Sequence, residues 1–224
     1  MFSRLERIID ETDFLKIKQI KVLIVGLGGV GGHAFEALVR MGVVNFTVID
    51  NDVFDVSNLN RQLLATQDNI SFKKVLEAEK RAKAINSDVN IEALDWFLNT
   101  DNFDKLVIDR FDYVLDCCDT VETKILLIKK CLENNIKVIS CMGSGNRFDP
   151  TKLEITNIWK TNNDPLAKKM RKLLKDNHIT KKVNVVCSRE IPVKSGQQIG
   201  STSLVPSVAG IYMASFVIND IISK

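Results

Sequence analysis

The sequence has little of several features that would set a chain apart from an ordinary globular protein. It has only two histidines in 224 residues, His33 and His178, and neither stands in a recognisable catalytic context. Its five cysteines are odd in number, none forms a C-x-x-C pair, and Cys117 and Cys118 are adjacent. Disulfide frameworks and zinc sites use cysteines in pairs at characteristic spacings, and this sequence lacks such pairs. We therefore expect reduced thiols and a cytoplasmic protein.

Charge of one sign and long apolar runs are also scarce. The net charge of +3 does not by itself predict a nucleic-acid partner. The first residues carry charges where a signal peptide needs an apolar stretch. The longest uncharged run, residues 195–219, includes Gln, Ser, Gly and Pro, and only its second half is apolar. We therefore predict a buried helix there and no stable membrane insertion, which needs about 20 mostly apolar residues.

The sequence does contain alternating strand and helix patterns. Residues 21–25 and 46–50 read as strands on either side of a helix at 30–41, which predicts a parallel strand–helix–strand unit. Further helices at 72–85 and 121–133 alternate with strands at 89–94, 113–116 and 137–141. The pattern predicts an α/β fold with a Rossmann-like, doubly wound, mostly parallel sheet.

The pattern changes after residue 145. Strands are predicted at 152–158 and 183–193, a basic helix from Asp164 and Pro165 to about residue 176, and a closing helix at 206–222. There are no repeats and no low-complexity linker. We expect a single domain over 1–224, with an N-terminal helical arm at 1–20, a core at 21–145 and a small C-terminal α+β extension at 146–224.

A glycine loop lies between the first strand and its helix. Residues 26–31 read Gly-Leu-Gly-Gly-Val-Gly, a G-x-G-x-x-G pattern with Gly26, Gly28, Gly29 and Gly31. Such glycines allow a tight turn and let phosphate approach backbone N–H groups at a helix N-terminus. Asp50 ends the second strand, where an acid can bind ribose hydroxyls. These features predict a nucleotide but do not separate NAD from ATP.

Polar and cationic residues follow Asp50. Asn58, Arg61 and Gln62 lie directly after the strand, and Lys74 begins a predicted helix 13 residues past Arg61. An Arg and a Lys near a glycine loop suit a triphosphate, which carries more charge than a dinucleotide pyrophosphate. Asp119 follows the strand at 113–116 and could hold Mg²⁺ against phosphates. The alternative for Asp119 is a cap for the helix at 121–133.

These residues together resemble the superfamily of ubiquitin-activating enzymes and their bacterial relatives that adenylate sulfur-carrier proteins. The match is a ThiF-type ATP-binding domain, and it spans the glycine loop, Asp50, Asn58-x-x-Arg61-Gln62, Lys74 and Asp119. The resemblance implies that Asp50 binds ribose and that Asn58, Arg61 and Lys74 hold phosphates. It also implies that Asp119 serves Mg²⁺ and catalysis. It further implies a homodimer in which an N-terminal arginine, Arg4 or alternatively Arg7, reaches the partner's site.

A closer resemblance is to the tRNA threonylcarbamoyladenosine dehydratases. It rests on the opening Phe2-Ser3-Arg4, on residues 142–150 and on the Asp164-Pro165 region, and the paired C-x-x-C motifs of sulfur-carrier adenylyltransferases are absent. It implies ATP-dependent cyclisation of threonylcarbamoyladenosine beside the tRNA anticodon, through an acyl adenylate. It leaves open whether a monovalent cation binds and whether a sulfur-transfer protein docks.

Two features lie outside the core. Lys168, Lys169, Arg171, Lys172 and Lys175 crowd one helix, either as a solvated face or, in a tRNA-facing extension, as a phosphate-contacting surface. Cys187 follows two valines and is interpreted as a buried strand residue rather than a covalent acceptor. Three other functions remain as alternatives. The first is an adenylyltransferase for a ubiquitin-like or sulfur-carrier protein, and the second is a non-catalytic nucleotide-binding partner. The third is an NAD-dependent dehydrogenase, in which Arg61 and Lys74 would have no role.

Overall fold

The computed structural model describes residues 1–193, 196 and 198–222, so residue 195, which begins the long uncharged run, lies outside the described part. The described residues form seven strands: β1 (Lys21–Val25), β2 (Asn45–Ile49), β3 (Asn90–Leu94), β4 (Tyr113–Asp116), β5 (Lys137–Cys141), β6 (Leu153–Asn157) and β7 (Asn184–Ser188). They also form the α-helices α1 (Glu11–Gln19), α2 (Gly31–Arg40), α3 (Lys74–Ile85), α4 (Val121–Glu133), α5 (Pro165–Asp176) and α6 (Leu204–Ile222).

The strands make one sheet in the order β3-β2-β1-β4-β5-β7-β6. All neighbours are parallel except β6 and β7, which pair antiparallel. The predicted α/β class and mostly parallel sheet are therefore confirmed, and both strands of the C-terminal extension belong to the same sheet as the core. The chain order reverses between β1 and β4, which is where open α/β sheets bind ligands at the carboxyl ends of their strands.

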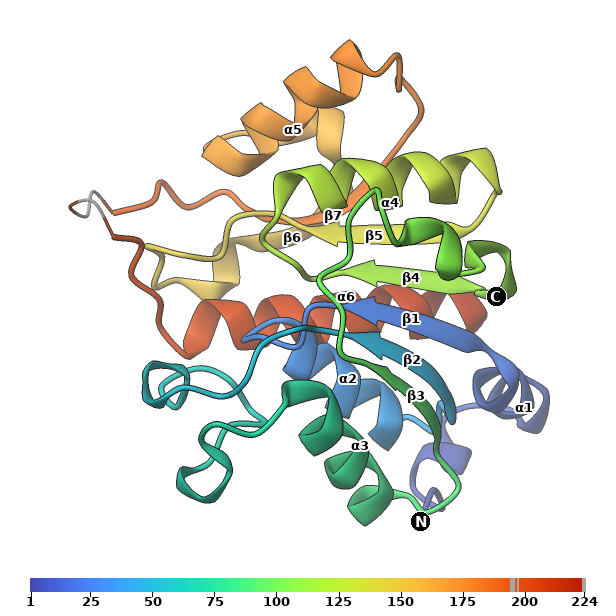
Figure 1. Cartoon of the computed structure of the whole chain (residues 1–224). Helices are drawn as coiled ribbons and strands as arrows, with labels where there is room; N and C mark the ends of the chain where they lie inside the picture. The colour runs from blue at the N-terminus through green and yellow to red at the C-terminus, as the bar shows by residue number, and fades with distance from the viewer. Residues whose placement is uncertain (194–195, 197, 223–224) are drawn as a thin grey trace.

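Helices cover both faces of the sheet (Figure 1). One hydrophobic core lies between the sheet and α2, α3 and α6, and the other lies between the sheet and α4 and α5. The central strands β1 and β4 are buried on both faces, since every residue of β4 and all but the first of β1 are buried. Two-sided burial explains the continuous apolar runs at residues 22–25 and 113–115 of these strands.

Helix α6 is the one described helix long and apolar enough to cross a membrane, with a mean hydropathy of 1.5. It instead packs along α2 and the sheet, with Val205, Ala209 and Met213 fully buried. At Gly210 the two helices are so close that a Cβ atom would lie 2.3 Å from the Val30 carbonyl oxygen. Its place in the core agrees with the buried helix predicted from the sequence.

Several predicted boundaries differ from the structure, including the start of α6 at Leu204 rather than 206, and two of the differences have a clear cause. The strand predicted at 183–193 ends at Ser188, and the chain beyond it leaves the sheet, where Val193 N donates to Asn146 O at 2.8 Å. The apolar Ile191 and Val193, which suggested a longer strand, are exposed. Helix α3 begins at Lys74 rather than residue 72, because Ser71 has a φ of 70° and turns the chain before the helix.

Candidate functional site

A cleft of about 950 Å³ opens at the carboxyl ends of the central strands. It is formed by the segments that follow β1, β2, β3, β4 and β5, with α6 closing part of one side. The sequence-predicted residues that line it are Gly26, Gly28, Gly29, Asp50, Asn58, Arg61, Lys74 and Asp119. The topology thus brings together residues that are spread over most of the core.

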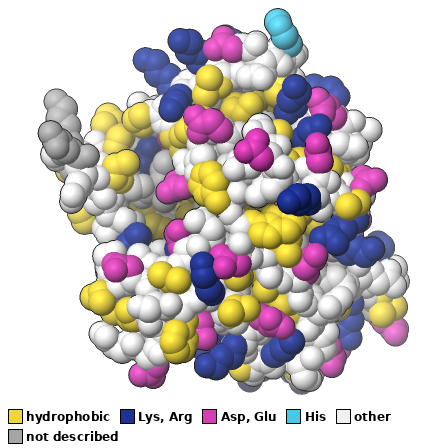
Figure 2. All heavy atoms as spheres, viewed as in Figure 1, with side chains coloured by type: hydrophobic (Ala, Val, Ile, Leu, Met, Phe, Trp, Pro, Cys, Tyr) yellow, Lys and Arg dark blue, Asp and Glu magenta, His cyan; other side chains and the backbone are white. Residues whose placement is uncertain are grey.

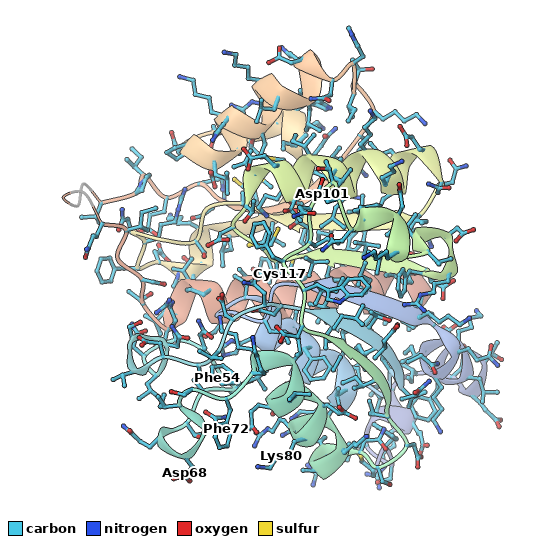
Figure 3. The ribbon with its side chains drawn as sticks, viewed as in Figure 1. Phe54, Asp68, Phe72, Lys80, Asp101 and Cys117 are labelled. Carbon is cyan, nitrogen blue, oxygen red and sulfur yellow. The ribbon has the colours of Figure 1, made fainter. Side chains whose placement is uncertain are left out.

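The glycine loop turns tightly against β4. Gly26 has a φ of 91°, and a Cβ atom there would lie 2.8 Å from the carbonyl carbon of Cys117, which Figure 3 places at the centre of the sheet edge. A Cβ atom at Gly31 would lie 1.8 Å from the Gly26 carbonyl oxygen. At Gly28 the nearest atom to such a Cβ is Gln62 Nε2, at 3.9 Å, so this part of the backbone is open to a ligand.

Asp50 supports the glycine loop as well as facing the cleft. Its Oδ2 accepts a hydrogen bond from Leu27 N at 2.7 Å, and its Oδ1 accepts one from Asp52 N at 2.9 Å. A carboxylate oxygen can accept more than one hydrogen bond. Asp50 can therefore hold the loop in place and still bind a hydroxyl group in the cleft.

The segment after β2 is held by backbone pairing. Buried Phe54 donates its N–H to Phe72 O at 3.0 Å and accepts at its own carbonyl from Ser71 N at 2.8 Å. Figure 3 shows Phe54 and Phe72 together on the loops below the cleft. Asn58 is buried and its Oδ1 accepts from Asp55 N at 3.2 Å. This bonding fixes the backbone that carries the polar residues.

The two predicted cations lie on the same side of the glycine loop. Arg61 Nη1 donates to Ser57 O at 2.7 Å and to Asn60 Oδ1 at 2.9 Å, which orients the guanidinium. Lys74, the first residue of α3, is only 4% exposed. Its Nζ lies 2.8 Å from Asp52 Oδ2, whose side chain is 60% exposed. Lys74 is thus a cation at the base of the cleft with a solvent-facing counter-ion.

Asp119 lies across the glycine loop from these cations, after β4. It is exposed, and its side chain forms no hydrogen bond or ion pair with the described residues. The N-cap position of α4 is Thr120 rather than Asp119, and no side chain caps that helix. The helix-cap alternative is therefore wrong. The described residues contain no group of three or more His, Cys, Asp or Glu side chains placed to hold a metal ion, so Asp119 offers a single carboxylate.

A polar cluster that was not predicted as part of the site lies beneath the cleft. It consists of Asp116 at the end of β4, Ser140 and Cys141 at the end of β5, and Lys124 on α4. All four are buried, and burial raises the pKa of the Cys141 thiol to about 12. The available signal was Asp116, a charged residue at the end of an otherwise apolar strand, which is unusual in a buried strand. Lys124 gave no such signal, because its helix carries several other charged residues.

Arg4 lies away from the cleft of its own chain. It is exposed in the N-terminal segment, where the Phe2 ring packs on Phe14 with centroids 5.2 Å apart. Both rings lie beside Gly42, at the amino-terminal end of the strands. Figure 1 places the chain's N-terminus at the side opposite the carboxyl ends of the strands. Within one chain, the structure therefore does not bring Arg4 to the other site residues.

The basic helix and Cys187 have separate surroundings. Four lysines of α5 are exposed: Lys168, Lys169, Lys172 and Lys175. Figure 2 shows Lys and Arg atoms at the top of the molecule, where Figure 1 places α5. Arg171 instead donates to Thr161 O at 3.0 Å, so it is partly engaged within the fold. Cys187 is buried in β7, as predicted, and burial raises the pKa of its thiol to about 12.

Comparison with known proteins places this geometry in a family. Residues 2–223 match the model of the ThiF family. A tRNA threonylcarbamoyladenosine dehydratase of Bacillus subtilis is 36% identical over 239 residues, which cover 99% of this chain and 94% of that protein. The crystal structure of the Escherichia coli tRNA N6-threonylcarbamoyladenosine dehydratase in complex with ATP superposes with a TM-score of 0.94 at 33% identity, covering 100% of this chain and 94% of that one. The chain belongs to the ThiF family.

Proposed function

We infer that this chain is an ATP-dependent tRNA threonylcarbamoyladenosine dehydratase. The observation that carries the inference is the full-length similarity to enzymes of that name together with a cleft of matching chemistry. The cleft combines an open glycine loop, the cations Arg61 and Lys74, and the free carboxylate of Asp119. An NAD-dependent hydride transfer would leave Arg61 and Lys74 without a role.

The reaction has two steps. A carboxylate oxygen of the threonine moiety attacks the α-phosphorus of ATP, and pyrophosphate leaves. The neighbouring carbamoyl group then attacks the carbonyl carbon of the acyl adenylate and closes a ring; it releases a proton, while AMP leaves with the former carboxylate oxygen. The attacking group is already attached to the substrate, so proximity replaces an enzyme nucleophile. The reaction therefore does not require buried Cys187 as a nucleophile.

The residues of the cleft position two anions. Asp50 binds the ribose, the open backbone near Gly28 takes phosphate, and Asn58, Arg61 and Lys74 hold the phosphate oxygens and offset their charge. Asp119 fits Mg²⁺ binding, because Mg²⁺ is commonly held by one or two carboxylates together with substrate phosphates. Bound there, the ion would add Lewis-acid stabilisation of phosphate charge.

The substrate and the second subunit occupy other surfaces. We assign the exposed lysines of α5 to tRNA phosphate, since salt-sensitive contacts of this kind dominate nucleic-acid affinity. We further propose a symmetric homodimer in which Arg4 enters the partner's cleft. Arg4 is exposed and lies away from the cleft of its own chain, so it is free to contact another molecule.

The test is mass spectrometry of tRNA nucleosides. Incubating threonylcarbamoyladenosine-containing tRNA with the protein, ATP and Mg²⁺ should convert that nucleoside to a form lighter by one water, with one AMP released per ring closed. Omitting ATP serves as the control. The adenylyltransferase alternative rests on a Haemophilus influenzae molybdopterin-synthase adenylyltransferase that is 35% identical over 162 residues. An unchanged nucleoside, with an adenylate formed instead on a carrier protein ending in Gly-Gly, would favour that alternative.

A further inference from the structure

A buried ion pair lies directly beneath the cleft. The side chains of Lys124 and Asp116 are 1% and 0% exposed. Lys124 Nζ donates to Asp116 Oδ1 at 3.2 Å, to Asp116 Oδ2 at 3.1 Å and to the Cys141 carbonyl oxygen at 2.7 Å. An ammonium group has three protons, and these bonds use all of them. The bonds tie the end of β4 to the end of β5 through α4.

The carboxylate is also fully engaged. Asp116 Oδ2 accepts from Ser140 Oγ at 2.5 Å, and Oδ1 accepts from Cys118 Sγ at 3.1 Å. Removing two charges from water is costly, and well-packed apolar residues often stabilise a core as well as a buried ion pair does. Stability alone is therefore a weak reason for this cluster, whereas its place at two strand ends suggests a role in the site.

The segments that begin at these strand ends line the cleft. Residues 117–120, which include Asp119, follow Asp116, and residues 142–145 follow Cys141. Cys117 also touches the glycine loop: its N–H donates to Val25 O at 2.8 Å, and its carbonyl group leaves no room for a Cβ atom at Gly26. A shift of Asp116 would therefore move Asp119 relative to the glycine loop, which Asp50 holds through Leu27 N.

We propose that Lys124 is a positioning residue for the adenylation step: it holds Asp116 and Cys141 together and so fixes where Asp119 stands in the cleft. The proposal rests on the proposed function, because it assigns Asp119 to the phosphates of ATP. Lys124 touches no substrate, since it is enclosed by the fold. Its effect reaches the reaction only through the placement of residues 117–120.

The test separates placement from stability with two variants and a matched control. Lys124→Met leaves the Asp116 carboxylate buried and unpaired, so its thermal midpoint should fall. Adding Asp116→Asn removes the unpaired charge at the same size and should recover most of that midpoint. In both variants we expect kcat to fall 10-fold or more, while KM for ATP stays within about 3-fold, because Arg61 and Lys74 still hold the phosphates. Lys129→Met, at an exposed position of the same helix, should match the wild type.

A second measurement needs no tRNA. Hydrogen exchange of the ATP-loaded protein should show the amides of residues 117–120 exchanging at least 10-fold faster in the double variant, with α4 as protected as in the wild type. A double variant with wild-type kcat, or with wild-type exchange at residues 117–120, would overturn the proposal, whether or not its midpoint recovers. Failure of the proposed function has a different signature, since the wild type itself would then leave the tRNA nucleoside unchanged.

Discussion

Asp119 stands apart among single residues because it lines the cleft without supporting the fold. It is exposed, and it does not cap α4. Its carboxylate is therefore available to a ligand, and its substitution should change chemistry without changing stability.

We expect Asp119→Asn to lower kcat by about 100-fold or more, which is the size of effect that loss of one preorganised electrostatic group produces. The thermal midpoint should stay at the wild-type value. Ring-closed nucleoside formed per minute is the measurement, with Asp68→Asn as control, since Asp68 is exposed and lies away from the cleft in Figure 3. A wild-type rate in the Asp119 variant would remove this residue from the mechanism.

Lys74 supplies positive charge at little structural cost. Its partner Asp52 is mostly exposed, so Lys74→Met leaves no buried carboxylate and should cost less than about 1 kcal/mol of unfolding free energy. The KM for ATP should rise about 10-fold or more, because the phosphates lose a charged contact. Titration with ATP measures the KM, and denaturant unfolding measures the unfolding free energy.

Lys80→Met is the matched control for that variant. Lys80 lies on the same helix, its side chain is 76% exposed, and Figure 3 shows it directed away from the cleft. The assignment of Lys74 to the phosphates would have to be withdrawn if the two variants had the same KM for ATP.

The buried surroundings of Cys187 lower the reactivity of its thiol. Burial raises the pKa of its thiol to about 12, so the reactive thiolate is scarce near neutral pH. We expect Cys187→Ala to keep kcat within about 3-fold while losing about 1 kcal/mol of stability through the smaller side chain. Intact-protein mass spectrometry during turnover should show no covalent adduct. A folded but inactive variant would instead revive a thioester intermediate.

Residues that line the cleft were easier to predict from the sequence than residues that support them. Gly26, Asp50 and Lys74 follow strand ends or begin helices, where the sequence pattern already predicts a cleft. Lys124 lies in the first turn of α4, and a lysine on a helix usually faces water. Its burial follows from a partner at the end of β4, and a pairing between distant segments cannot be read from one sequence.

At the scale of elements, α5 presents two different faces. Ala167, Met170 and Leu174 are buried, whereas Lys168, Lys169 and Lys172 are exposed. Replacing these three lysines by Ala should weaken tRNA binding and leave the KM for ATP unchanged, and helix content should survive because Ala favours helix.

The salt dependence of tRNA affinity decides that prediction. For every phosphate that the variant no longer binds, the slope of log affinity against log salt should fall by about 0.7 to 0.9. Arg171 is left in place because its bond to Thr161 supports the fold. Equal slopes for wild type and variant would identify the helix as a solvated face, and the tRNA surface would then lie elsewhere.

Strand and helix boundaries were predicted well where buried apolar residues are dense. The expected bounds of β4, α4 and β5 agree with the structure, and each is rich in buried apolar residues. The prediction failed past Ser188, where alternating apolar residues imitate a strand but bond to a loop. Hydrophobic pattern does not distinguish a strand from an extended segment that lacks a neighbour in the sheet.

At the scale of the whole molecule, the proposed homodimer makes each cleft depend on two chains. Arg4→Ala should lower activity although it lies far from the cleft of its own chain. Mixing the impaired Arg4→Ala and Lys74→Ala subunits should restore activity, because one of the two clefts in a mixed dimer then has both residues. Sedimentation checks the dimer, and turnover of the mixture checks the complementation. No recovery in a mixed dimer would exclude a crossing Arg4.

The parts of the cleft are made at different times during protein synthesis. Asn60 Nδ2 bonds to Ser201 O across 141 residues of sequence, and Pro206 at the start of α6 lies against Gly29. The ribosome therefore makes the glycine loop well before part of the cleft wall, since Ser201 follows Asn60 by 141 residues. Contacts between such distant segments slow folding and leave apolar surface uncovered in the meantime. A nascent chain therefore contains the glycine loop well before the cleft around it is complete.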